Sequence, residues 1–111
     1  MAAKPLVWMG DSLERVRTFS AAVRQRIGFE MWEIQQGGPP SDSKPMSDIG
    51  PGVRELRVRS AGAYRVIYLA TMREAVYVLH AFEKKSRKTD GPDIDLARIR
   101  FKELMLEKRR R

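Results

Sequence analysis

The sequence predicts an α+β fold: an N-terminal strand, a long helix or helical hairpin, an antiparallel three-stranded meander and a C-terminal helix. Three strand-like runs, VRELRVR, AYRVIYLA and AVYVLHAF, follow one another between residues 53 and 82 and are separated by short turns. Before them, apolar residues recur every three or four positions over residues 13–34, which is the spacing of an amphipathic helix. The same spacing returns over residues 94–104. This order of elements favours one antiparallel sheet with helices before and after it.

The first strand is expected at PLVWM, residues 5–9, and we place it inside the sheet because it is apolar throughout. Asp11, with Glu14 three positions later, predicts a capping box at the start of the helical region. Ser20 can divide that region by acting as an internal cap, so a helical hairpin and one bent helix both fit. The apolar stripe consists of Leu13, Val16, Phe19, Val23, Ile27, Met31 and Ile34.

Residues 36–52 interrupt every periodic pattern. They contain four of the six prolines and four of the eight glycines, so we expect a loop without regular structure that is mobile over residues 37–52. The turns of the meander are expected at residues 60–62 and 71–74.

The last strand, VYVLHAF, is apolar on both faces and is expected at the buried centre of the sheet. Its His80 alternates with Val76, Val78 and Phe82, and we interpret it as a hydrogen-bonded core histidine, although its ordinary pKa would suit proton transfer.

The C-terminal helix is expected to start near Pro92, with Thr89 or Asp90 as its cap. Its apolar stripe consists of Ile94, Ala97, Phe101 and Leu104. The basic tail at residues 108–111 follows the last apolar position, which predicts a frayed end.

A chain of 111 residues, 42% hydrophobic and 32% charged, predicts one domain over residues 1–111. No apolar run approaches the roughly 18 to 20 residues that span a bilayer, and the first residues do not resemble a secretory signal. We therefore expect a cytoplasmic protein without a membrane partner. The absence of cysteine and the single histidine argue against a zinc site, so we expect neither a metal nor a cofactor.

The net charge of +8 is unevenly placed. Residues 1–52 carry six Lys or Arg and six Asp or Glu, whereas residues 53–111 carry sixteen and eight. A positive excess confined to the half that holds the meander favours a polyanionic partner, with nucleic acid first and acidic protein second.

Two arginines lie inside the first hairpin of the meander. Arg57 and Arg65 are both odd-numbered and flank the turn, so a hairpin that keeps its register would place both guanidinium groups on one face. Such a pair would form a cationic site of the size of a phosphate. The alternative is a solvated face on which Glu55 is a cross-strand partner of one arginine.

Four segments carry a resemblance to a known family. They are VWMGDS at residues 7–12, IGFEMWEIQQG at 27–37, VRELRVRSAGAYRVIYLA at 53–70 and VLHAFEKKSRKT at 78–89. Taken in this order, they make the chain similar to the RelE/ParE toxin superfamily. The chain most closely resembles its phage-derived Gp49-like and HigB-type toxins of type II toxin–antitoxin systems.

The resemblance implies a metal-independent endoribonuclease that cuts mRNA, commonly on the ribosome. It also implies inhibition by a cognate antitoxin, which we expect to be a helix-turn-helix protein encoded by an adjacent gene. ParE-like members of the same superfamily are not nucleases and bind a protein target, DNA gyrase, so a non-catalytic toxin remains an alternative. A phage-derived nucleic-acid-binding module without either activity is a third.

Matched residue by residue, the resemblance implies three catalytic positions. Arg65 would bind the reacting phosphate, Arg57 occupies a basic strand position, and Lys85 would assist the leaving group. The catalytic tyrosine of RelE has no counterpart, because the chain reads SRKTDGPD where it would lie. Further RNA-binding cations are expected at Arg59, Lys84, Arg87 and Lys88.

Overall fold

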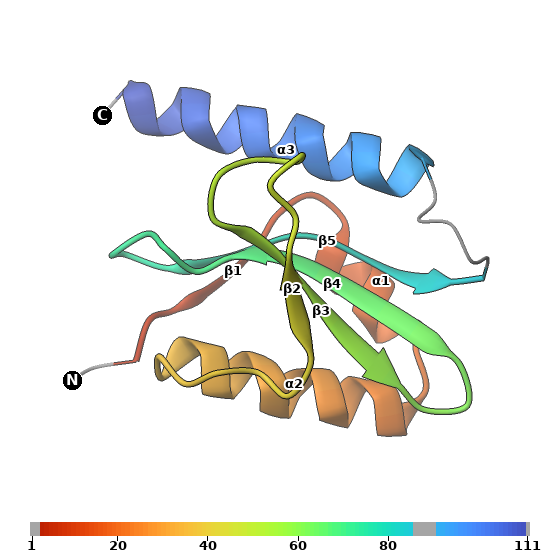
Figure 1. Ribbon diagram of the computed structural model, residues 1–111. Coiled ribbons are helices and arrows are strands. Elements are labelled where there is room, and N and C mark those ends of the chain that lie inside the picture. Colours follow the sequence, from red (N-terminus) through yellow and green to blue (C-terminus); the bar gives the residue numbers. More distant parts are fainter. Residues whose placement is uncertain (1–2, 86–90, 111) are drawn as a thin grey trace.

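The computed structural model describes residues 3–85 and 91–110. A five-stranded sheet in the order β1-β5-β4-β3-β2 is flanked by helices on both faces (Figure 1). The strands are β1 (Leu6–Trp8), β2 (Ser43–Pro45), β3 (Val53–Arg59), β4 (Ala63–Leu69) and β5 (Val76–Lys84), and the helices are α1 (Ser12–Arg17), α2 (Ala21–Gln35) and α3 (Gly91–Arg109). The predicted α+β class, the meander and the C-terminal helix are confirmed, and the arrangement is compatible with a RelE-like fold.

Of the two alternatives for the helical region, the structure has two helices, divided at Ser20. Its hydroxyl oxygen accepts a hydrogen bond from the Val23 amide at 3.4 Å, which satisfies one free donor of the first turn of α2. The capping role predicted for Asp11 is wrong. In the described part of the chain its side chain accepts no capping hydrogen bond, because its carboxylate instead binds Arg15 and Arg100.

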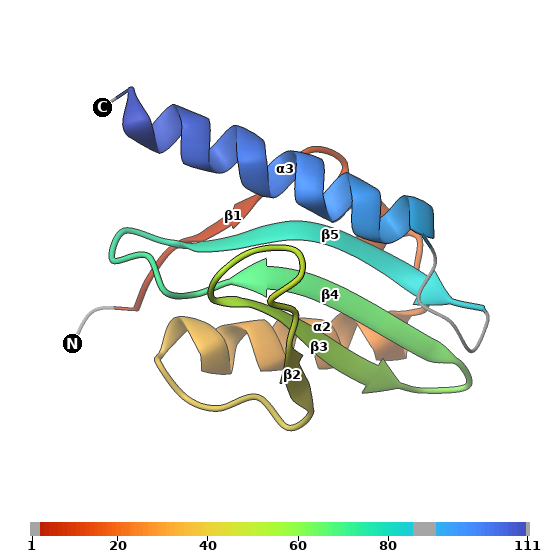
Figure 2. The same ribbon diagram turned by 45° about the horizontal axis from the view of Figure 1, so that its top comes forward.

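Two apolar clusters fill the two faces of the sheet. Helices α1 and α2 cover one face, whose buried residues include Val16, Val23, Ile27, Met31, Leu56, Val66, Val76 and Val78. Helix α3 runs along β5 on the other face (Figures 1 and 2), whose buried residues include Val53, Ile67, Leu79, Phe82, Ile94, Ala97 and Leu104. Strands β4 and β5 therefore carry buried apolar residues on both faces.

Strand β1 lies at an edge, so the predicted interior position is wrong. It pairs in parallel with residues 76–78 of β5. Leu6 and Trp8 pack on the cluster below α1 and α2, and Met9 packs on the cluster below α3. A strand covered on both faces needs apolar residues on both sides even when its outer edge is free, and this explains why its composition was misleading.

The segment predicted to lack regular structure contains β2, which pairs antiparallel with residues 54–56 of β3. Pro45 is tolerated in β2 because an edge strand needs amide donors on one side only. The expectation of an entirely irregular loop over residues 36–52 is therefore wrong.

All residues of β5 from 76 to 82 are buried, as predicted, but the middle strand of the sheet is β4. A β-bulge interrupts the pairing of these two strands: Ile67 pairs with His80 and Tyr68 with Val78, so Leu79 is skipped. The predicted alternation of His80 with Val76 and Val78 is wrong, because the extra residue turns His80 to the α3 face, where Phe82 also lies.

Helix α3 continues to Arg109, so the prediction of a frayed tail is wrong for Lys108 and Arg109. The Lys108 ammonium group donates a hydrogen bond to the Glu74 carboxylate in the turn before β5. The predicted caps, Thr89 and Asp90, lie outside the described residues. No described helix is long and apolar enough to cross a membrane.

Candidate nucleic-acid interface

The register of the meander arranges four cations in two adjacent rows on the α3 face of the sheet. Arg57 in β3 lies directly opposite Arg65 in β4. In the next row Ala63 pairs with Arg59 on one side and with Lys84 on the other. Neighbouring strands are about 4.8 Å apart, so Arg59 and Lys84 flank the small Ala63 side chain at a separation of about 10 Å. The prediction that Arg57 and Arg65 share one face is confirmed, and we call these four residues the cationic rows.

The cross-strand role considered for Glu55 is also confirmed. Its Oε1 lies 3.5 Å from Arg65 Nε, 3.6 Å from Arg57 Nε and 3.8 Å from Lys44 Nζ, and only 2% of its side chain is exposed. Among the residues that the structure describes, Glu55 Oε2 and Arg57 Nε are buried atoms without a hydrogen-bond partner. Glu55 thus holds the two arginines side by side through charge, while its second oxygen and one arginine donor remain unsatisfied.

The two arginines differ in accessibility. Arg65 donates a hydrogen bond from Nη1 to the Tyr64 carbonyl at 3.1 Å, and 7% of its side chain is exposed. Burial lowers the pKa of Arg65 below the ordinary arginine value; the Glu55 charge opposes this effect, and the charges of Arg57 and Arg59 add to it. Arg57 is 31% exposed. Arg57 therefore presents the larger side-chain surface to a ligand, and Arg65 contributes a fixed positive charge next to it.

Arg57 and Arg59 also line a cavity of about 370 Å³ at the edge of the sheet. Arg26 of α2 and Asp42, in the segment between α2 and β2, contribute to the same wall. The Arg57 amide donates to the Asp42 carbonyl at 2.9 Å. Sequence reasoning missed Arg26, because α2 covers the opposite face of the sheet and reaches this cavity only around its edge.

Lys85 does not join Arg57 and Arg65. It is exposed just beyond β5 and lines a cavity of about 700 Å³ that also contains Arg15 of α1 and Asp93 of α3. Strand β4 and the width of β5 separate this cavity from β3. Arg87 and Lys88 lie outside the described residues, so the predicted roles of these two cations stay predictions.

One family model matches most of the chain. The family described as "Phage derived protein Gp49-like (DUF891)" matches residues 14–102, a range that contains all of the cationic rows and most of α3. The chain belongs to this Gp49-like family. No curated protein matches it at a significant level. Membership is consistent with a toxin of a toxin–antitoxin system.

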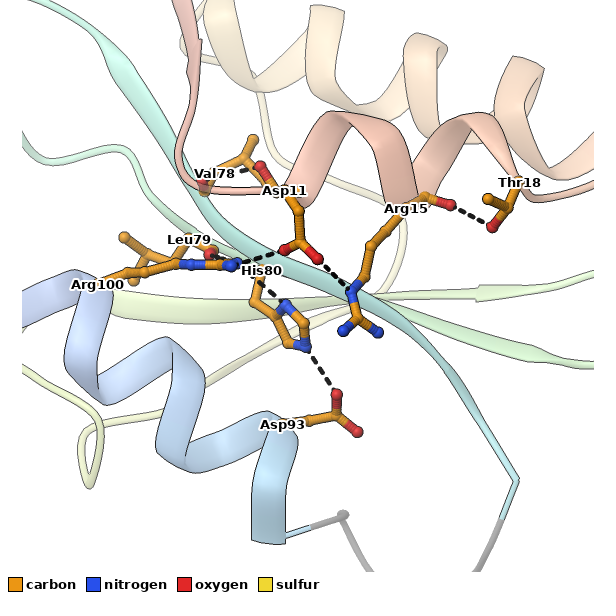
Figure 3. A network of polar contacts seen from close by, with 9 residues as sticks. Asp11, Arg15, Thr18, Val78, Leu79, His80, Asp93 and Arg100 are labelled. Carbon is orange, nitrogen blue, oxygen red and sulfur yellow. Dashed lines mark hydrogen bonds and ion pairs between the residues drawn. The ribbon is translucent and has the colours of Figure 1, made fainter.

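A second polar cluster of this Gp49-like protein joins α1, β5 and α3 (Figure 3). Arg100 donates to the Leu79 carbonyl at 2.9 Å, lies 3.3 Å from His80 Nδ1 and donates to Asp11 at 2.6 Å. His80 Nε2 lies 2.7 Å from Asp93 Oδ1. The Arg100 charge, which is almost fully buried, is therefore neutralised by Asp11 and oriented by two groups of β5.

These contacts determine the tautomer of His80. Arginine can only donate, so Nδ1 must accept from Arg100, and the ring proton lies on Nε2, where it is donated to Asp93. The ring is fully buried, and this desolvation lowers its pKa from 6.5 although Asp93 opposes the effect. His80 is thus neutral at pH 7, and its interpretation as a hydrogen-bonded core histidine is confirmed.

The sequence signal for this cluster is a charged residue within an apolar stripe. Arg100 lies three residues after Ala97 and four before Leu104, within the apolar stripe of the Gp49-like protein's last helix. A charged residue at a core-facing position requires a buried partner. Asp11 cannot be identified as that partner from the sequence, because 89 positions separate the two residues.

Proposed function

We propose that this Gp49-like protein is the toxin of a type II toxin–antitoxin system and that it acts as a metal-independent mRNA endoribonuclease, on the ribosome. The observation that carries the proposal is the pairing of Arg57 with Arg65, extended by Arg59 and Lys84 in the next row. Four cations on one side of a sheet match the repeated negative charge of an RNA backbone. The family match supports the toxin role.

The proposed reaction is transfer of a phosphoryl group within the RNA strand. The ribose 2′-oxygen attacks the adjacent phosphorus, the bond from phosphorus to the 5′-oxygen breaks, and the products end in a 2′,3′-cyclic phosphate and a 5′-hydroxyl. Water accepts the proton of the 2′-hydroxyl, and water supplies the proton that the leaving 5′-oxygen gains. Negative charge grows on the non-bridging phosphate oxygens during this step, so cations held in place beforehand stabilise the transition state.

Each cation has a defined role in this account. Arg57 contacts the phosphate because it is the more exposed of the paired arginines, and Arg65 adds a fixed positive charge next to it. The leaving-group role that the resemblance implies for Lys85 does not fit a phosphate bound at Arg57, because β4 and the width of β5 separate the two residues; Lys85, exposed beyond the end of β5, instead binds a neighbouring phosphate of the strand. Glu55 is unsuited as the general base, because it is 2% exposed and surrounded by three cations.

The test uses purified protein and a labelled mRNA fragment bound to purified ribosomes, with the same fragment free in solution as a comparison. Wild type is expected to cut the RNA and leave a 2′,3′-cyclic phosphate, and a single 2′-deoxy nucleotide at the cut site should abolish cleavage there. Arg57→Lys keeps the charge but loses the planar pair of donors, so the rate should fall roughly a hundred- to a thousandfold. Arg24→Lys is the matched control, because Arg24 is exposed on α2 on the opposite face.

A second candidate function is binding to a protein target without catalysis, as in ParE-like toxins. One observation favours a protein partner: Phe29 and Trp32 on α2 are each more than half exposed, and their rings stack at 6.5 Å. We assign this aromatic pair to the binding of the proposed helix-turn-helix antitoxin, which is also a protein partner, and not to a second target. If the Arg57→Lys variant no longer cleaves RNA but still arrests growth like wild type, the result would favour binding to a protein target instead.

A further inference from the structure

The larger cavity lies where one edge of β5 is free. Within the described residues, β1 covers this edge only as far as residue 78, and α1 and the start of α3 enclose the remainder. The resulting space of about 700 Å³ opens beside Lys85. It is therefore close to Lys84, whose pairing with Ala63 places it at the end of the cationic rows. A strand of RNA that crosses the rows arrives at this opening.

Aromatic side chains form part of the cavity wall. Phe19 and Tyr64 lie with ring centroids 4.8 Å apart at an angle of 54°, and Phe82 lines the same space. Phe82 is itself held by stacking on the buried His80 ring at 5.5 Å. Phe19 is only partly buried, so it offers a planar surface to a ligand. Stacking of one base on such a ring strengthens the binding of a single strand roughly five- to a hundredfold.

The cavity is lined by charges of both signs. Three carboxylates line it, from Glu14, Glu83 and Asp93, although the chain as a whole carries a net charge of +8. Three negative groups disfavour a phosphate inside the cavity but readily accept hydrogen bonds from an amino group. The Asp93 carboxylate is held in orientation because His80 Nε2 donates to its Oδ1 at 2.7 Å.

Two cations complement these acceptors. Arg15 donates from Nε to Asp11 at 3.0 Å, and in the described part of the chain its two terminal nitrogens make no hydrogen bond (Figure 3). Lys85 is exposed. Both line the same cavity and are able to bind the phosphate of a nucleotide whose base contacts the aromatic wall.

We propose that this cavity binds one nucleobase of the RNA and prefers a base with an exocyclic amino group, which is adenine, cytosine or guanine, over uracil. This inference rests on the proposed endoribonuclease function and assigns that function a source of sequence preference. The aromatic wall stacks on the base, Glu14, Glu83 and Asp93 accept its amino protons, and Arg15 with Lys85 binds the attached phosphate.

The experiment measures binding without cleavage. The four nucleoside 5′-monophosphates are titrated separately into the protein while side-chain resonances of Phe19, Tyr64 and Phe82 are followed by NMR. AMP, CMP and GMP are expected to shift these resonances with dissociation constants roughly tenfold below that of UMP, since one hydrogen bond to a charged acceptor contributes about 1.5 kcal/mol. Inorganic phosphate alone should leave the aromatic resonances unchanged.

Two variants test the origin of the preference. Glu83→Gln replaces a pure acceptor by a group that also donates, so UMP should bind better and the preference should shrink several-fold. Phe19→Leu removes the stacking surface, so all four nucleotides should bind at least fivefold more weakly. Glu103→Gln is the control for Glu83, because Glu103 is exposed on α3 outside the cavity. It should behave like wild type.

Three results would overturn the inference: UMP binding as tightly as the other nucleotides, equal effects of Glu83→Gln and Glu103→Gln, or unshifted aromatic resonances at about 10 mM nucleotide. If wild type cleaves RNA and any of these results is found, the proposed base-binding cavity is rejected and the proposed nuclease function stands. If nucleotides bind selectively but wild type cleaves no RNA, free or on the ribosome, the nuclease function is rejected and the base-binding cavity stands.

Discussion

Arg57 and Arg65 lie directly opposite each other in the β3–β4 ladder, although like charges in this position repel. Their arrangement depends on Glu55, whose buried Oε1 atom lies within 3.6 Å of the Nε atoms of both arginines. One carboxylate cannot neutralise two guanidinium groups, so the cluster retains a positive charge even before Lys44 is counted. A buried excess of positive charge is a cost to folding that an anionic ligand would offset.

Glu55→Gln should destabilise the fold. The change preserves the size of the side chain but leaves the Arg65 charge buried without its carboxylate, which typically costs about 3–5 kcal/mol. Urea denaturation measures the free energy of unfolding, and Glu103→Gln, at an exposed site, should change it by less than about 0.5 kcal/mol. The double variant Glu55→Gln/Arg65→Met should recover part of the loss. Equal stability of Glu55→Gln and the control would contradict the buried cluster.

His80 should make stability depend on pH below about 6.5. Burial lowers its folded pKa below 6.5, so on acidification the unfolded chain takes up the proton first. The contribution of His80 to the free energy of unfolding is therefore fully present above pH 6.5. It is lost as the pH falls from 6.5 to the pKa of the folded state. Because His80 is the only histidine, an NMR titration of its ring is unambiguous. A midpoint at or above 6.5 would contradict the buried neutral ring.

Asp11 and Glu74 titrate outside that window. Hydrogen bonds from Arg100 to Asp11 and from Lys108 to Glu74 lower the pKa of each carboxyl group to about 2. Their contributions are present above the usual carboxyl range and are lost only as the pH falls below about 4.5. A decline in stability between pH 6.5 and 5 is therefore attributable to His80.

Two glycines should respond in opposite directions to alanine. Gly10 has φ +54°, and an added Cβ would lie 2.4 Å from the Arg100 guanidinium carbon. Gly10→Ala should cost at least about 1–2 kcal/mol, since it strains the backbone and displaces Arg100 from Asp11. Gly28 lies within α2 with no atom of the described structure within 4 Å of an added Cβ, so Gly28→Ala should stabilise by about 0.5–1 kcal/mol. Thermal denaturation of both variants measures the contrast, and equal shifts would contradict the close approach of Arg100.

RNA affinity should fall steeply with salt. Each neutralised phosphate of single-stranded RNA contributes about −0.7 to the slope of log affinity against log salt, so contacts by the exposed cations predict roughly −3 to −5. Arg59→Ala and Lys84→Ala should each reduce the slope by about 0.7, whereas Arg24→Ala should not. Fluorescence anisotropy with a labelled RNA measures the slope. An affinity that hardly changes with salt would exclude the cationic rows as the binding surface.

Local patterns predicted the elements because each depends on neighbouring residues. Alternation identified the meander, and the parity of Arg57 and Arg65 predicted their common face because the turn at residues 60–62 preserves the register. The Ser20 cap could be predicted for the same reason, since its partner lies three residues away.

Long-range features could not be predicted in this way. The bulge at Leu79 shifts His80 to the α3 face without a glycine or proline to mark it. Asp11 occupies a suitable cap position in the sequence. Its carboxylate nevertheless accepts a hydrogen bond from the buried Arg100, from the other end of the chain, and not from an amide of α1. Lys85 is next to Lys84 in sequence, but Lys84 lies on the sheet face and Lys85 lies beyond the end of the strand. Their neighbouring positions in the sequence therefore did not predict that they belong to different sites.

Mapping of transcript 5′ ends after brief induction of the protein in cells tests the endoribonuclease function most directly. Wild type is predicted to create new 5′-hydroxyl ends inside coding regions within minutes, Arg24→Lys to create the same ends, and Arg57→Lys to create almost none while remaining folded by circular dichroism. Growth arrest by wild type without any new transcript ends would contradict the nuclease account.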